Sequence, residues 1–159
     1  MKKKILLLVL GLIALIMSPF PGLSGSDIQE EKDYSSFYAY DKSLPLNAEE
    51  KIIVDKDTYR VYKIYFDSVN GERVPALLSI PKKREKVPCI VFLHGYGGSK
   101  EDILPIAELI AAEGYAIIAI DAEFHGERKE EGKELYSPNL NESRNGIIQT
   151  IIDLRRAVD

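Results

Sequence analysis

The sequence is poor in cysteine and in histidine, and neither sign of charge dominates it. The single cysteine, Cys89, excludes an internal disulfide. It begins an apolar run, which predicts a small buried side chain; a thiol nucleophile would need an exposed turn and a neighbouring base. The formal charge is −4, with basic and acidic residues interspersed, so the composition gives no indication of nucleic-acid binding.

Two common kinds of binding site are also missing. The two histidines, His94 and His125, are 31 positions apart, which is not a metal-ligand spacing. Asp121, Glu123 and His125 fall at alternate positions, but this pattern alone does not predict a metal site. The glycine-rich stretch after His94 lacks the lysine of a phosphate-binding loop, so neither a nucleotide nor another cofactor is expected.

The amino end has an apolar run that is short for a membrane span. Residues 5–17 are apolar and follow three lysines, whereas a spanning helix needs about 20 residues. Small residues at 22–26 offer cleavage positions after the helix-breaking prolines. Residues 1–26 therefore predict a secretory signal peptide and an exported protein. The alternative is an uncleaved anchor formed by residues 5–20, which would attach the protein to a membrane.

The rest of the chain has the composition of one globular domain, with 45% hydrophobic and 29% charged residues. Residues 27–50 are polar and have no steady period, which predicts an irregular lead-in. Its aromatic side chains could pack on the flank of the domain or line a groove; they are Tyr34, Phe37, Tyr38 and Tyr40. The domain proper is expected to comprise residues 51–159.

Four strands are predicted. Residues 59–69 alternate in polarity, Asn70-Gly71 is a strong hairpin signal, and residues 74–80 form the returning strand. Residues 89–93 and 115–120 are continuous apolar runs, which favour strands buried on both faces of a parallel sheet.

Two helices are predicted beside these strands. Residues 101–113 have helical spacing and stop at Gly114, so a strand, a helix and a strand follow one another and predict a parallel pair. Residues 129–145 are polar and predict a loop at the edge of the sheet. Residues 146–159 return to helical spacing, with Arg155 and Arg156 expected on the exposed side.

Two motifs follow the buried strands. The first is His94-Gly-Tyr-Gly-Gly98, where three glycines in four residues permit positive φ and a close approach to the backbone. Main-chain N–H groups at such a corner can bind an anion or a developing oxyanion. The second is Asp121-Ala-Glu-Phe-His-Gly-Glu-Arg128, which would lie at the same sheet edge. Both histidines lie in turns, where either a structural or a catalytic role is conceivable.

Together the two motifs resemble the α/β-hydrolase superfamily over residues 59–159, most closely its esterase, dienelactone-hydrolase and prolyl-oligopeptidase-like branches. The resemblance implies an α/β fold, a three-layer sandwich with a mostly parallel sheet that opens with an antiparallel hairpin. It implies that the main-chain N–H of Tyr96 belongs to the oxyanion hole. It also implies loop support from His94, Gly95, Gly97 and Gly98, and a substrate-edge loop containing Asp121, His125, Gly126 and Arg128. In this superfamily the catalytic acid and base histidine come later in the chain.

The nucleophile of that superfamily is missing, because no Gly-x-Ser-x-Gly occurs in the 159 residues. In the resembled enzymes this motif follows the helix with which the present sequence ends. The sequence is therefore expected to be the amino-terminal half of an exported serine hydrolase, with one sheet edge open and no turnover by itself. Its substrate would be a small-molecule ester or, less commonly, a peptide. The alternative is a non-catalytic exported binding module on the same scaffold.

Overall fold

The computed structural model describes residues 33–82 and 86–159. The predicted signal peptide or anchor lies outside these residues. Residues 34–159 form one compact unit. Among the residues described, none of the helices combines the length and the apolar character that crossing a membrane requires.

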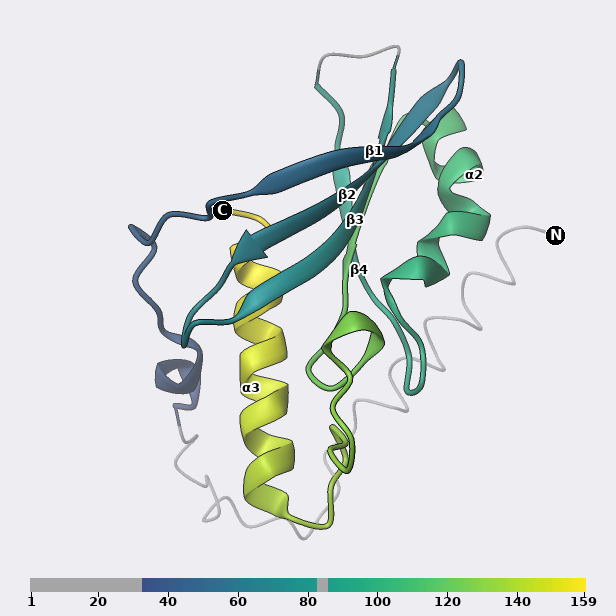
Figure 1. The fold of residues 1–159 in the computed structure, drawn as a ribbon. Helices are drawn as coiled ribbons and strands as arrows, with labels where there is room; N and C mark the ends of the chain where they lie inside the picture. Colours follow the sequence, from purple (N-terminus) through teal and green to yellow (C-terminus); the bar gives the residue numbers. More distant parts are fainter. Residues whose placement is uncertain (1–32, 83–85) are drawn as a thin grey trace, which may run out of the picture. The chain divides into compact units, whose positions relative to one another are not determined.

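The unit is built on one five-stranded sheet in the order β1-β2-β3-β5-β4 (Figure 1). The strands are β1 (Glu49–Asp55), β2 (Tyr59–Asp67), β3 (Arg73–Pro81), β4 (Cys89–Leu93) and β5 (Ala116–Ile120). Only β4 and β5 run parallel, and the other three neighbouring pairs are antiparallel. The prediction of a mostly parallel sheet is thus wrong for the described residues, whereas the parallel pair itself is confirmed.

The predicted hairpin is present, and one further strand was missed. Asn70 and Gly71 have φ values of 59° and 79°, and the strands pair from Asp67 with Arg73 onward. Positive φ at both central residues is what a type I′ hairpin turn requires. The additional strand, β1, lies at the edge of the sheet and has almost no buried face. Its sequence therefore lacks the alternation by which a half-buried strand is recognised.

The two apolar runs differ in burial. Every residue of β5 is buried, as predicted. In β4, by contrast, Ile90, Val91 and Leu93 are 37%, 44% and 43% exposed, and Cys89 is also exposed. The prediction of a strand buried on both faces, with a buried cysteine, is wrong for β4. The reason is its place at the edge of the described sheet, where it pairs only with β5.

The helices begin and end differently from the prediction. The first consists of a 3₁₀ segment, η2 (Lys100–Ile106), followed by α2 (Ala107–Ala112). Pro105 lies inside it and has no N–H to donate to the preceding turn, which disfavours a continuous α-helix. The last helix, α3 (Leu140–Arg156), starts six residues before the predicted position, and the loop is shorter by the same amount. The missed signal is Asn139, whose side chain accepts the N–H of Asn141 at 3.1 Å and caps the helix.

The helices cover opposite faces of the sheet, because neighbouring residues of β3 and β5 belong to two separate hydrophobic clusters (Figure 1). Leu77 and Ala119 pack with η2 and α2, whereas Ala76 and Ile120 pack with Leu154 of α3. The first cluster consists of Tyr59, Val61, Leu77, Ile103, Ala107, Ala111, Ile117 and Ala119. The second consists of Phe66, Val74, Ala76 and Ile120.

The buried face of α3 is largely polar, which the apolar spacing did not predict. Its buried residues are Gly146, Gln149, Thr150, Ile152, Asp153 and Arg156, while Ile147 is 37% exposed. Arg155 is exposed as predicted, but Arg156 is buried, contrary to the prediction. Its guanidinium donates to the carbonyl oxygen of Leu44 at 2.8 Å, so a charged residue fastens the lead-in to the domain.

The lead-in packs on the carboxyl end of α3. It contains a 3₁₀ turn, η1 (Ser35–Tyr38). The Tyr40 hydroxyl donates to the Asp159 carboxylate at 2.8 Å, and the Arg155 guanidinium lies 4.9 Å from the Tyr40 ring centroid. Packing on the flank is thus confirmed for Tyr40. Tyr34 and Phe37 stay exposed and stack on each other.

Candidate active site

The turn after β4 is built so that two of its positions need glycine. The Gly98 N–H donates to the Gly95 carbonyl at 3.0 Å, which closes a β-turn with Tyr96 and Gly97 in the middle. Gly97 has φ +76°, as the third residue of a type II turn requires. A Cβ atom on Gly98 would lie 2.4 Å from the Asp102 carboxylate. A larger residue at Gly97 or Gly98 would therefore strain or displace the turn.

His94 joins this turn to the loop after β5. Its Nε2 accepts the main-chain N–H of Ala122 at 3.1 Å, and this fixes the remaining proton on Nδ1, which donates to the Gly95 carbonyl at 2.8 Å. The ring is only 7% exposed. Both nitrogens are occupied by main-chain partners, so His94 has no free nitrogen with which to move a proton.

His125 lies beside His94, with 4.9 Å between the ring centroids. It is 8% exposed, and its Nδ1 is 2.8 Å from the Glu123 carbonyl oxygen. The described hydrogen bonds of both histidines thus go to main-chain atoms. Neither ring is bonded to a hydroxyl or thiol nucleophile in the described residues.

Gly126 opens a 3₁₀ turn, η3 (Gly126–Arg128), and it is fixed by Asp121. Its φ is +54°, and a Cβ atom there would lie 2.2 Å from the Asp121 carboxylate. That carboxylate is fully buried and accepts the N–H of Glu127 at 2.9 Å. Asp121 therefore shapes the loop in which it lies.

A fully buried lysine completes the Asp121 arrangement. Lys100 donates its main-chain N–H to Oδ1 of Asp121 and its ammonium to Oδ2, both at 2.8 Å. The same ammonium lies 2.6 Å from Glu127 and 2.9 Å from Glu101. The start of η2 is thus bound to the loop after β5 by charge as well as by packing.

This network shifts the pKa values of its members. Burial alone would lower the pKa of Lys100, but hydrogen bonds to Asp121, Glu127 and Glu101 raise it above its ordinary value. Burial alone would raise the pKa of Glu127, but hydrogen bonds from Lys100, Tyr65 and Lys63 lower it to about 2. Both groups are therefore charged at neutral pH.

Arg128 is the centre of a second buried network. Its guanidinium is 2.7 Å from the Asp153 carboxylate and 3.1 Å from Glu72, and it also contacts Glu123. The side chain is 7% exposed. Burial raises the pKa of Glu123, although Arg128 opposes this shift. Arg128 thus holds the loop after β5 against α3 and the β2–β3 hairpin, and it does not line the cavity described next.

A cavity of about 470 Å³ lies beside the segments that follow β4 and β5. The exposed ring of Tyr96 lies at it, with its centroid 5.6 Å from that of Tyr136 and 6.1 Å from that of His125. The lining comprises Tyr96, Gly97, Gly98, Phe124, His125, Gly126, residues 129–135, Ser137 and Pro138. Of the predicted site residues, the structure therefore brings Tyr96, Gly97, Gly98, His125 and Gly126 to one cavity. His94, Asp121 and the side chain of Arg128 are buried and do not line this cavity.

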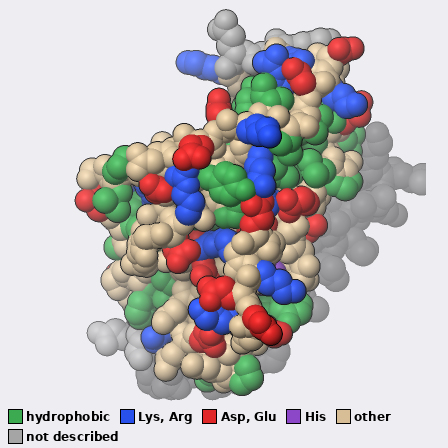
Figure 2. Space-filling model, viewed as in Figure 1, with side chains coloured by type: hydrophobic (Ala, Val, Ile, Leu, Met, Phe, Trp, Pro, Cys, Tyr) green, Lys and Arg blue, Asp and Glu red, His purple; other side chains and the backbone are tan. Residues whose placement is uncertain are grey.

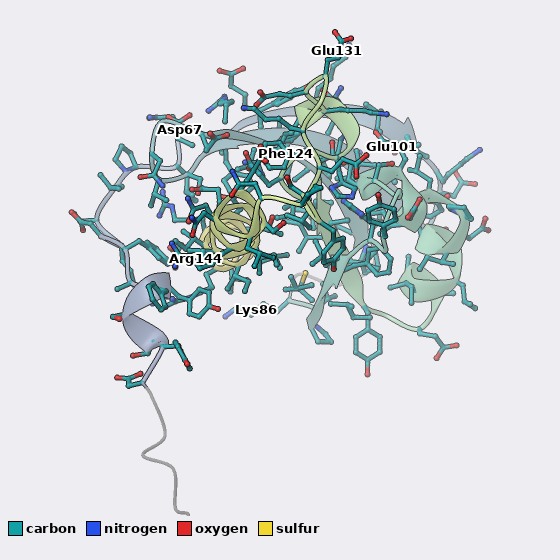
Figure 3. The ribbon with its side chains drawn as sticks, turned by 90° about the horizontal axis from the view of Figure 1, so that it is seen from below. Asp67, Lys86, Glu101, Phe124, Glu131 and Arg144 are labelled. Atoms are coloured by element: carbon teal, nitrogen blue, oxygen red, sulfur yellow. The ribbon has the colours of Figure 1, made fainter. Side chains whose placement is uncertain are left out.

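A second cavity, of about 630 Å³, shares Phe124 and Lys133 with the first and lies along the amino-terminal half of α3. Figure 3 shows Phe124 between α3 and the loop that carries Glu131. Phe124 has φ +60°, which is uncommon for a bulky residue and often accompanies functional sites.

Lys100, Asp153 and Phe124 are site residues that the sequence did not reveal. A lysine after Ser99 has the pattern of a solvated helix start, and Asp153 lies among apolar residues that suggest a core face. Asp121, the buried partner of Lys100, is 21 positions away in sequence, and Arg128 is 25 positions from Asp153, so no local pattern identifies these two pairs. None of the groups of His, Cys, Asp and Glu in residues 33–82 and 86–159 is arranged to hold a metal ion.

The chain is similar in sequence to known esterases. The sequence model of the family described as Acetyl xylan esterase (AXE1) matches residues 26–157. "Putative esterase YitV" of Bacillus subtilis (strain 168) is 41% identical over 64 residues, which is 40% of this chain and 25% of that protein. The chain thus spans a quarter of the length of this relative.

Two solved structures share the fold. Acetyl xylan esterase 1 from Thermoanaerobacterium sp. JW/SL YS485 superposes with a TM-score of 0.58 at 20% identity, over 72% of this chain and 39% of that one. The "putative acetyl xylan esterase" of Bacteroides fragilis NCTC 9343 gives a TM-score of 0.55 at 18% identity, over 74% and 38% of the two chains. The mixed sheet and its helices therefore have the α/β fold of these two structures, and this chain spans 39% and 38% of their lengths.

Proposed function

This chain belongs to the acetyl xylan esterase (AXE1) family, and we propose that it supplies the oxyanion-hole half of an exported serine esterase. The relatives named above support a hydrolase of the esterase type. The finer proposal is a three-layer α/β-hydrolase sandwich that continues beyond the present sequence and acts on acetyl esters of a carbohydrate. Peptide bonds are a less favoured substrate.

The observation that carries this proposal is the placement of Tyr96 in a turn held by His94. The turn follows the parallel strand β4, and the main-chain N–H of Tyr96 takes no part in the hydrogen bond between Gly98 and Gly95. When a nucleophile attacks an ester carbonyl, negative charge develops on the carbonyl oxygen. A main-chain N–H aimed at that oxygen stabilises the transition state by typically about 3 kcal/mol, provided that it is held in place beforehand.

The rest of the site supports such pre-organisation. His94 fixes the turn to the Ala122 N–H, and the Lys100–Asp121 pair fixes the following 3₁₀ segment to the same loop. Because the donor is a main-chain group, the Tyr96 side chain remains available for another task. The serine nucleophile, the acid and the base histidine would come from polypeptide beyond residue 159, so we expect the 159-residue chain to bind without turnover.

Export is part of the proposal and rests on the amino-terminal pattern alone. The alternatives are a membrane-anchored enzyme, if residues 5–20 are retained, and a non-catalytic binding module on the same scaffold. On the face shown in Figure 2, lysines and arginines are mixed with acidic residues. That mixture gives no support to a nucleic-acid partner on this face.

The experiment is to read the gene beyond codon 159 and to express the encoded protein. We expect a Gly-x-Ser-x-Gly within roughly two dozen codons, followed by an aspartate and a histidine. The longer protein should hydrolyse 4-nitrophenyl acetate, and replacement of the motif serine by alanine should abolish this hydrolysis. The proposal fails if the frame encodes no such motif, or if the 159-residue chain hydrolyses the ester as fast as the longer protein.

A further inference from the structure

Two tyrosine rings stand side by side, and neither is buried. Tyr96 lines the first cavity, and Tyr136 lies next to Tyr96, outside the residues that line it. Tyr96 is 68% exposed and Tyr136 is 63% exposed. Their ring centroids are 5.6 Å apart and the ring planes are tilted by 45°. Exposed aromatic surface next to a cavity is typical of a recognition site, because a ligand that covers the rings removes their apolar surface from water and so binds favourably.

The Tyr96 ring is held in position rather than free. Its hydroxyl donates to the Glu134 carboxylate at 3.4 Å, and its edge meets the His125 ring, with 6.1 Å between centroids. Its own main chain forms the turn of the proposed oxyanion hole. The ring and the proposed oxyanion-hole N–H thus belong to the same residue. A group stacked on the ring would therefore lie beside an ester carbonyl bound at that N–H.

The charged residues around the rings largely balance one another. Two lysines and three glutamates line the cavity: Lys129, Lys133, Glu130, Glu131 and Glu134. Lys133 pairs with Glu130 at 2.5 Å and also lies over the Phe124 ring, while Glu134 accepts from Tyr96. A cavity of this kind offers little net charge to an ionic ligand, but it offers many hydrogen-bond donors and acceptors to a neutral ligand with several hydroxyl groups.

We propose that Tyr96 and Tyr136 form a platform on which a sugar ring of the substrate stacks, with its hydroxyl groups bonded to the surrounding lysines and glutamates. The C–H face of a pyranose is apolar and its rim is polar, which matches a pair of rings beside a cavity whose lining carries charges of both signs. This inference rests on the proposed esterase function. It makes Tyr136 a specificity residue, which improves the binding of saccharide esters and leaves the binding of small acetate esters unchanged.

The experiment measures binding by NMR titration of the 159-residue chain and so needs no nucleophile. The probes are xylotetraose, acetylated xylotetraose and acetylcholine. We expect both saccharides to bind, Tyr136→Ala to weaken binding about 3- to 10-fold, and Tyr136→Phe to retain it, since the phenyl ring provides the stacking surface. Tyr115→Ala is the matched control, because Tyr115 is 43% exposed and lies at the amino end of β5, whereas the candidate site follows the carboxyl end of that strand.

Three results would overturn the platform. They are no saccharide binding at millimolar concentration, equal binding by wild type and Tyr136→Ala, and tyrosine-dependent binding of acetylcholine in place of the saccharides.

The two proposals can fail separately. Hydrolysis of 4-nitrophenyl acetate by the longer protein without saccharide binding would leave the esterase intact and remove the platform. Tyrosine-dependent saccharide binding with no hydrolysis by the longer protein would support the platform and remove the enzyme.

Discussion

The ammonium of Lys100 and the carboxylate of Asp121 lie 2.8 Å apart, and both side chains are 0% exposed. They come from the segments that follow β4 and β5, the two parallel strands whose ends form the candidate site. Glu127 and Glu101 complete the hydrogen bonding of the lysine. The pair therefore fixes the segments that follow β4 and β5 relative to each other, without lining the cavity.

Replacement of one partner of this pair should be strongly destabilising. Lys100→Met leaves the Asp121 carboxylate buried without its cation, and breaking a buried pair in this way typically costs about 3–5 kcal/mol in the free energy of unfolding. Urea unfolding of the 159-residue chain measures this. Lys63→Met is the matched control, because Lys63 also pairs with Glu127 but is a third exposed, and we expect a loss of about 1 kcal/mol or less. Similar losses for the two variants would contradict the structure.

Glu127 should make the stability fall in acid. Its pKa is about 2 in the folded chain against an ordinary 4.5, so the unfolded state takes up protons first as the pH falls. The stabilising contribution is complete above pH 4.5 and is lost as the pH falls toward 2. Other carboxyls titrate in the same range, so the measurement compares the pH dependence of unfolding for wild type and Glu127→Gln. The wild-type curve should be the steeper one, and parallel curves would argue against the network.

Gly126 and Gly132 allow backbone strain to be separated from close packing. Both have positive φ, but a Cβ atom on Gly126 would overlap the Asp121 carboxylate, whereas no atom lies within 4 Å of one on Gly132. Gly132→Ala should cost about 1–2 kcal/mol, the usual cost of a left-handed residue with a side chain. Gly126→Ala should cost at least twice as much. Equal losses in thermal or urea unfolding would show that Asp121 does not lie against Gly126.

Local chemistry made part of this molecule predictable. The Asn70-Gly71 turn, the buried run of β5 and the glycines after β4 each depend on neighbouring residues, and the sequence predicted all three correctly. Burial at a sheet edge and the pairing of distant charges do not depend on neighbours. The apolar sequence of β4 is the same whether or not a further strand pairs with it. No residue near Lys100 in the sequence indicates that Asp121 is its partner. For the same reason the family resemblance implied a loop at the substrate edge for Arg128 but did not predict that its side chain would be buried.

The role of the Tyr96 main chain can be tested by changing the donor and keeping the turn. Tyr96 occupies the second position of the Gly95–Gly98 turn, where proline is well accommodated, but proline has no N–H. In the longer protein, Tyr96→Pro should lower kcat for 4-nitrophenyl acetate by about 10²- to 10³-fold, as loss of one oxyanion donor does. Tyr96→Phe keeps the N–H and should stay within about 3-fold of wild type, because the loss of a neutral hydrogen bond at the surface is worth little. If Tyr96→Pro retains wild-type kcat and unfolds at the same urea concentration, the oxyanion hole does not use this N–H.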